Sequence, residues 1–184
     1  MVIFLIVLAI LVLLVVWGFT TYNGLVKRSL SCDEAFATMD VYLKKRFDMI
    51  PNLVETVKGY AKHESETLEK VIAARNAGAA GQTVEQRMES ENQISGALRQ
   101  IFALTESYPD LKANQNFMQL MGQLQTIEAD IANSRKYFNA VVRDYNTATM
   151  TVPSNIIANM TGFSPRPMFE VDDASERQNV KVQF

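Results

Sequence analysis

Cysteine and histidine are almost absent from this chain, which has one of each among 184 residues. The single thiol, Cys32, excludes an intramolecular disulfide framework and a thiolate cluster that binds metal within one chain. The single histidine, His63, lacks the second imidazole that a zinc-peptidase helix presents on the same face. We therefore expect no disulfide, no metal site and no cofactor.

An excess of positive charge is also missing. The chain has 18 Lys and Arg against 20 Asp and Glu, which gives a formal net charge of -2. The two signs are interspersed, so no basic surface is indicated that would attract a polyanion. We expect no nucleic-acid partner.

Charge is absent altogether from residues 2–19. As a helix this stretch spans about 27 Å, close to the hydrocarbon thickness of a bilayer. A cleaved signal peptide needs a basic segment before the apolar run and small side chains after it, but only Met1 precedes the run and bulky residues end it. Trp17, Phe19 and Tyr22 suit the membrane–water interface. The sequence predicts that residues 1–22 are a retained transmembrane anchor whose partner is the lipid bilayer.

Basic side chains follow the anchor and none precedes it. Lys27 and Arg28 come first, and Lys44, Lys45 and Arg46 follow. By the positive-inside rule, this order predicts a single-pass protein of the inner membrane with its soluble domain in the cytoplasm. Lipid attachment at Cys32 is not expected, because basic residues separate the thiol from the apolar run.

Beyond the anchor, apolar residues recur at a spacing of seven, which is typical of packed helices. A first helix carries two such series and extends to a turn at Gly78-Ala79-Ala80-Gly81. Pro51 lies inside it, so the helix either bends there or restarts with Pro51 in its first turn. The two series are Leu43, Ile50, Val57 and Val71, and Phe47, Val54, Ala61 and Leu68.

Two further long helices are expected. One starts after a cap at Thr83 and runs to about Ser107, with an alternative reading as a solvent-facing segment because residues 89–95 are polar. Tyr108-Pro109-Asp110 ends it. The other is capped by Asn114 and carries the clearest seven-residue series: Phe117, Leu124, Ile131, Phe138 and Tyr145.

A short helix over residues 154–160 follows, with Ser154 as its cap and Gly162 as its end. We thus predict an all-α protein in which residues 23–163 form one elongated antiparallel bundle of three long helices and a short C-terminal helix. Residues 164–184 form an extended tail. Residues 180–184 alternate apolar and polar, as a strand or a peptide added to a partner's sheet edge does, although a frayed terminus is the alternative.

No catalytic constellation is evident. Cys32 and His63 are about thirty residues apart with nothing to orient them together, and the glycine-containing turn lacks the Lys-Ser/Thr of a phosphate loop. Acidic residues of the first helix alternate with lysines, which predicts surface ion pairs. Polar residues of the third helix are predicted to bond inside the bundle, with a ligand site as the alternative. The two sets are Asp40, Asp48, Glu55, Glu66 and Glu69, and Glu128, Arg135, Asn139, Arg143 and Asn146.

An ordered series of motifs resembles the LemA family over roughly residues 22–170. The sequence departs from the family pattern at Cys32-Asp33-Glu34-Ala35-Phe36, where an Asn-Ala-Trp-like segment is typical, and after Glu170. The matching motifs include Tyr22-Asn23-x-Leu25-Val26, Ile50-Pro51-Asn52-Leu53-Val54-Glu55, Tyr108-Pro109-Asp110-Leu111-Lys112-Ala113-Asn114, Arg135-x-Tyr137-x-Asn139, Val142-Arg143-Asp144-Tyr145-Asn146 and Pro153-Ser154-Asn155-Ile156-Ile157-Ala158.

The resemblance implies an N-terminal anchor, an elongated helical bundle and no known enzymatic activity. Some members are tied to magnetosome membranes, and their genes often lie beside those of membrane peptidases. We expect no catalytic, cofactor-binding or metal-binding residues and no small-molecule substrate, and therefore no enzyme. The leading hypothesis is a homo-oligomeric scaffold that organises or shapes the bacterial membrane through the seven-residue seam. The alternative is an adaptor that recruits a membrane peptidase or a signalling protein.

Overall fold

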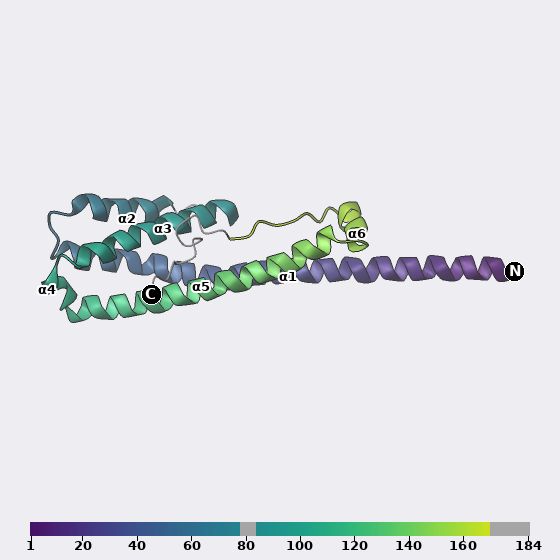
Figure 1. Ribbon diagram of the computed structural model, residues 1–184, viewed down its shortest axis with the longest axis horizontal. Coiled ribbons are helices and arrows are strands. Elements are labelled where there is room, and N and C mark those ends of the chain that lie inside the picture. Colours follow the sequence, from purple (N-terminus) through teal and green to yellow (C-terminus); the bar gives the residue numbers. More distant parts are fainter. Residues whose placement is uncertain (78–83, 170–184) are drawn as a thin grey trace, which may run out of the picture. The chain divides into compact units, whose positions relative to one another are not determined.

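The computed structural model describes residues 1–77 and 84–169, and within these ranges every regular element is a helix (Figure 1). The predicted all-α class is therefore confirmed for the part of the chain that is described. The predicted turn at residues 78–81, the Thr83 cap and the pattern at residues 180–184 lie outside it. The helices are α1 (Val2–Lys58), α2 (Ser65–Ala77), α3 (Val84–Thr105), α4 (Pro109–Lys112), α5 (Gln115–Met150) and α6 (Ser154–Thr161).

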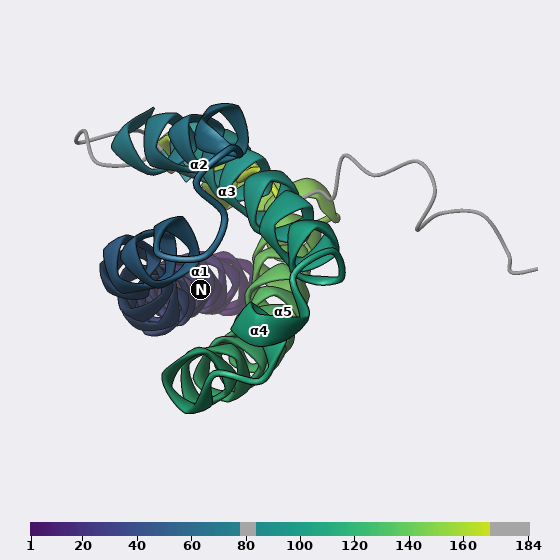
Figure 2. The same ribbon diagram turned by 90° about the vertical axis from the view of Figure 1, so that its left-hand side faces the viewer.

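The chain divides into two compact units, and α1 and α5 each contribute to both. The first unit comprises Met1–Met39 and Ser134–Met168, and so contains the first part of α1, the last part of α5 and all of α6. The second unit comprises Asp40–Asn133 together with Phe169. It contains α2 and α3, which lie side by side (Figures 1 and 2).

The first predicted soluble helix is in fact two helices. Pro51 lies inside α1, which neither ends nor restarts there but continues to Lys58. The chain turns over residues 59–64, where the amides of Tyr60 and Ala61 both donate to the carbonyl of Val57. It returns as α2. The seven-residue pattern continues across the turn because Val57 and Val71, on opposite sides of it, are buried in the same core.

Pro51 is tolerated because a side chain replaces the hydrogen bond that proline cannot make. A proline leaves the carbonyl four residues earlier without its intrahelical donor. That carbonyl belongs to Phe47, and it accepts a hydrogen bond of 3.4 Å from Nε of Arg75 on α2. The Arg75 guanidinium also lies 4.1 Å from the centre of the Phe47 ring. One side chain of α2 therefore stabilises the helix at its weakest point.

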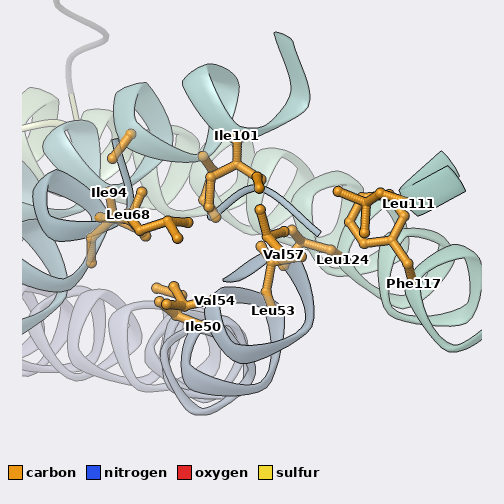
Figure 3. Close-up of a cluster of buried hydrophobic side chains, with 14 residues drawn as sticks. Ile50, Leu53, Val54, Val57, Leu68, Ile94, Ile101, Leu111, Phe117 and Leu124 are labelled. Atoms are coloured by element: carbon orange, nitrogen blue, oxygen red, sulfur yellow. The ribbon is translucent and has the colours of Figure 1, made fainter. Parts of the chain in front are cut away.

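One hydrophobic cluster holds the second unit together (Figure 3). It joins the last turns of α1 to four other helices, so both predicted seven-residue series supply the chain's own core. At about 25 cal/mol per Å² of buried apolar surface, such a cluster is the main source of stability in a unit of this size. Its larger members are Ile50, Leu53, Val54, Val57, Leu68, Ile94, Leu98, Ile101, Leu111, Phe117 and Leu124.

Of the three caps and stops predicted for α5 and α6 at Asn114, Ser154 and Gly162, two are confirmed. Oδ1 of Asn114 accepts a hydrogen bond of 2.9 Å from the amide of Phe117, and so caps α5 as expected. Gly162 ends α6 with φ 80°, a left-handed conformation that favours glycine. Ser154 does not cap α6. Its hydroxyl instead donates to the carbonyls of Ala148 and Thr151, because the preceding turn brings these acceptors close.

Candidate functional site

The first turns of α1 form a continuous exposed apolar surface. A window of 18 residues has a mean hydropathy of 3.3, and none of it is buried. Residues 1–16 are all exposed, and Trp17 and Gly18 are the first that other parts of the chain half cover. This segment is long and apolar enough to cross a membrane. Exposed side chains of this kind need an apolar environment.

Just beyond this segment, Arg166 is the centre of a group of polar contacts in the first unit. Its Nη1 lies 2.5 Å from Oδ1 of Asp33, and its Nη2 donates to the hydroxyl of Ser29 at 2.8 Å. The guanidinium lies 5.4 Å from the centre of the Tyr145 ring. We call Ser29, Asp33, Tyr145, Asn146 and Arg166 the juxtamembrane cluster. It links the segment after α6 to both α1 and α5.

Asn146 fixes the backbone of Arg166. Its amide nitrogen donates to the Arg166 carbonyl, and its oxygen accepts from the Arg166 amide, both at 2.8 Å. The Tyr145 hydroxyl donates to the Ser164 carbonyl at 3.0 Å. Asn146 therefore bonds within the chain, as predicted, but to the segment after α6 and not to another helix. The sequence did not predict Arg166 as the partner of Asn146, because Arg166 is twenty residues further along the chain and no local pattern connects the two.

Two pKa values in this region are shifted. The hydrogen bond to Asp33 raises the pKa of Arg166 above its usual value, against the opposing effect of partial burial. Burial raises the pKa of the Cys32 thiol, and the positive charge of Arg166 only partly opposes this. Cys32 has no exposed surface. A buried, protonated thiol is a poor nucleophile, so the geometry does not favour Cys32 as a reactive or lipidated residue.

A shallow groove of about 390 Å³ lies between α1 and α5 in the first unit. We call it the lateral groove. Nε of Arg28 contacts Oδ2 of Asp144 at 2.9 Å within it. Two large side chains of this unit, Leu30 and Tyr137, are 55% and 59% exposed. The groove is lined by Lys27, Arg28, Ser31, Tyr137, Ala140, Val141 and Asp144.

The second unit contains a buried charge cluster around Arg46. Its guanidinium has no exposed surface and contacts the carboxylate of Glu91, which is 1% exposed. Nη1 of Arg46 also donates to Oε1 of Glu128 and to the hydroxyl of Ser95, both at 2.8 Å. The cluster therefore joins α1, α3 and α5. Two acidic groups and a hydroxyl are the partners of its two terminal nitrogens, whereas Nε is buried without a hydrogen-bond partner among the described residues.

Arg87 connects this cluster to the surface. Its Nε lies 3.3 Å from Oε1 of Glu91, and its Nη2 lies 3.1 Å from Oδ1 of Asp40. The solvent-facing alternative for this part of α3 is wrong, because Glu91 and Ser95 face Arg46. Of the basic residues that follow the anchor, Arg46 is the one that the folded domain pairs internally.

The remaining predicted residues divide between surface and interior. His63 is exposed as expected, but in the turn between α1 and α2 and not on a helix. Ion pairs on the helix surface are confirmed for Lys44–Asp48, Lys58–Glu55 and Lys70–Glu66. Asp40 differs, since its partner is on α3. Arg135 and Asn139 both make interactions within the described chain, and Arg143 is exposed. Across residues 1–77 and 84–169, no three His, Cys, Asp or Glu are placed to hold a metal ion.

The exposed apolar segment and the all-helical fold define a membrane-anchored helical protein. A family model described as the LemA family matches residues 35–184. The chain belongs to the LemA family. The matched range includes the tail after Glu170, where the motifs had indicated a departure.

Similar proteins extend this match toward the N-terminus. Magnetosome protein MamQ of Magnetospirillum gryphiswaldense is 25% identical over 96% of this chain and 76% of its own length. Magnetosome protein MamQ 2 of Paramagnetospirillum magneticum is 23% identical over 89% of this chain and 70% of its own. Protein LemA of Metamycoplasma hominis is 26% identical over 85% of this chain and 75% of its own. In each comparison the similarity covers at least 85% of this chain and 70% of the relative.

Proposed function

We propose that the protein is a non-enzymatic scaffold of the bacterial inner membrane. α1 anchors each copy in the bilayer, and copies associate side by side to organise or shape that membrane. The observation that supports this best is that α1 is one helix from the apolar segment to Lys58. No loop separates the anchor from the part of α1 that packs with α5. Lateral contacts between copies would therefore act directly on the anchors.

The contact surface cannot be the seven-residue seam. Phe117, Leu124, Ile131, Phe138 and Tyr145 are all at most 4% exposed and belong to the chain's own core. We assign the contact instead to the lateral groove and the exposed side chains of Leu30 and Tyr137. Lys27 and Asp144 both line this groove. In a two-fold contact, we propose that Lys27 of one copy approaches Asp144 of the other, which also pairs with Arg28 of its own chain.

Even a weak contact between copies can support an assembly, because the copies share a membrane. Anchoring confines them to two dimensions and to one orientation, which raises their effective concentration. A surface too weak to hold a dimer in solution can then support an assembly. The non-enzymatic part of the proposal is supported by the burial of Cys32 and of the Arg46 cluster, since neither presents a reactive group to solvent.

Light scattering and electron microscopy of the full-length protein, in mild detergent and in nanodiscs, test the scaffold. We expect an oligomer for the wild type. The double variant Leu30→Glu with Tyr137→Glu should dissociate it, because four like charges meet at each contact. Met118→Glu is the matched control, since Met118 is 53% exposed on α5 in the other unit. A monomeric wild type in nanodiscs at every concentration would exclude the scaffold.

In that case the adaptor hypothesis takes its place. Its proposed binding segment, residues 180–184, lies outside the described residues, and its support is the alternating pattern of Val180, Val182 and Phe184. Deleting residues 180–184 should abolish capture of a membrane peptidase or signalling partner and leave any self-assembly unchanged.

A further inference from the structure

We propose that α6 forms a second membrane contact, in which the side chains of Val152, Ile156 and Met160 enter the interface of the bilayer that the anchor crosses. This inference rests on the proposed anchoring of α1, because the anchor determines where the lipid lies. It adds a surface that the scaffold does not require. The occupant of this surface is lipid at the level of the headgroups and the first acyl carbons.

The position of α6 beside the end of the apolar segment carries the proposal. Cδ1 of Ile157 lies 3.8 Å from the point that a Cβ on Gly18 would occupy. The rings of Tyr22 and Phe163 lie 5.8 Å apart between centroids. Gly18 and Tyr22 flank the end of the apolar run at Phe19. Within the first unit, α6 is therefore level with the last turn of the anchor, and the earlier turns of α1 extend beyond it (Figure 1).

α6 has apolar side chains on two faces. Ala158 is fully buried and Ile157 is half-buried toward α1. On another face, Val152, Ile156 and Met160 are 78%, 52% and 78% exposed. Ile156 and Met160 are four residues apart and so share one face of α6, and Val152 is exposed in the turn just before the helix. In water, a short helix normally keeps only one apolar face, so the second face indicates an apolar partner.

The chemistry around α6 suits an interface. Residues 145–165 contain no charged side chain, and the polar groups of this segment are hydroxyls and amides. Such groups hydrogen-bond to headgroups without the cost of desolvating a charge. Trp17 and Tyr22 place aromatic rings at the same level, as in the aromatic belts of membrane proteins. A helix lying in this plane buries its apolar face by about 5–10 Å.

Depth-dependent fluorescence quenching tests the contact in the full-length protein. Cys32→Ser removes the native thiol, and single cysteines are introduced as Ile156→Cys and Met160→Cys. Each is labelled with nitrobenzoxadiazole and placed in phosphatidylcholine–phosphatidylglycerol vesicles. The quenchers are lipids with a doxyl group on acyl carbon 5 and aqueous iodide. Leu11→Cys reports on the anchor, and Ala37→Cys, exposed about 27 Å along α1 from Phe19, reports on water.

We expect doxyl quenching at positions 156 and 160 to exceed that at position 37 by about threefold or more, with weak iodide quenching. Iodide quenching at 156 and 160 equal to that at 37, with Leu11→Cys quenched by lipid, would overturn the contact and leave the anchor intact. Shielding of 156 and 160 from both quenchers would assign the face to a protein, such as a second copy, and would also overturn it. A Leu11 label without lipid quenching would overturn the anchor and the proposed function.

Discussion

At the scale of the residue, Arg46 is a buried charge within a seven-residue series of α1 that is otherwise apolar. Leu25, Cys32, Met39, Arg46 and Leu53 are spaced by seven along α1, and all five are buried. A guanidinium in such a series costs desolvation free energy that only well-placed acceptors offset. Because Glu91, Ser95 and Glu128 supply them from α3 and α5, the arrangement fixes which turns of these helices face α1.

Removing Arg46 should therefore destabilise the second unit strongly. We expect Arg46→Ala to lower the free energy of unfolding by about 3–5 kcal/mol, because the buried Glu91 carboxylate loses the partner of its Oε2 and keeps only the longer contact with Arg87. The measurement is urea unfolding of the full-length protein in detergent, followed by far-UV circular dichroism. Lys45→Ala, at an exposed neighbouring position, is the control.

The paired substitution separates charge from packing. Arg46→Leu with Glu91→Leu should recover much of the loss, since both fully buried charges are removed together, while Arg87 keeps Asp40 as a partner and Glu128 is one-third exposed. A double variant as unstable as Arg46→Ala would show that the contribution of the cluster is not electrostatic.

Because the Cys32 thiol is buried, we expect the protein to lose stability at alkaline pH. Burial raises its pKa in the folded protein, so the unfolded thiol ionises first as pH rises. This contribution to stability is complete below the unfolded pKa of about 8.5 and is lost as pH rises toward the folded value. Unfolding midpoints measured from pH 7 to 10 should fall more steeply for the wild type than for Cys32→Ala. Parallel curves for the two proteins would contradict the assignment.

At the scale of the element, α1 shows why the sequence alone left open whether the helix bends or restarts at Pro51. The sequence placed Pro51 inside a helical pattern, but whether the helix ends there depends on a replacement donor. Arg75 supplies that donor to the Phe47 carbonyl from another helix. Residues 47–51 by themselves do not indicate that Arg75 supplies this donor.

The roles of Pro51 and Arg75 should be energetically coupled. Pro51→Ala restores the intrahelical hydrogen bond and should stabilise the protein by about 1–2 kcal/mol. Arg75→Met should cost about 1 kcal/mol in the wild type and less in the Pro51→Ala background. A double-mutant cycle by thermal unfolding measures the difference. Equal costs of Arg75→Met in both backgrounds would mean that the carbonyl contact is unimportant.

At the scale of the molecule, the basic residues that follow the anchor predict which side of the membrane the domain occupies. Lys27, Arg28, Lys44 and Lys45 are exposed, whereas Arg46 is paired inside. These four still favour a cytoplasmic domain under the positive-inside rule, which is the orientation we propose.

Labelling of an exposed cysteine measures this orientation. Cys32 is unsuitable because it is buried, so the probe is Ala37→Cys in a Cys32→Ser background. A membrane-impermeant maleimide should leave it unmodified in intact cells and should modify it fully after lysis. Labelling in intact cells would place the domain outside.

The sequence by itself determined the features that depend on local pattern. The charge-free segment, the helical class, the Asn114 cap and the Gly162 stop all follow from spacing and side-chain chemistry within a few turns. The ordered motifs also identified the family. The sequence also indicates that Arg46 is buried, since Arg46 lies on the same seven-residue series as Leu25 and Leu53.

Only the tertiary structure decided which residues meet across long separations. The break at residues 59–64, the pairing of Arg46 with Glu91 and the contact of Arg166 with Asp33 join segments that no periodicity connects. The same holds for the seven-residue seams, which the sequence could assign equally to a second copy or to the chain itself. A helical repeat specifies that a face is apolar, but the partner of that face depends on how the whole chain packs.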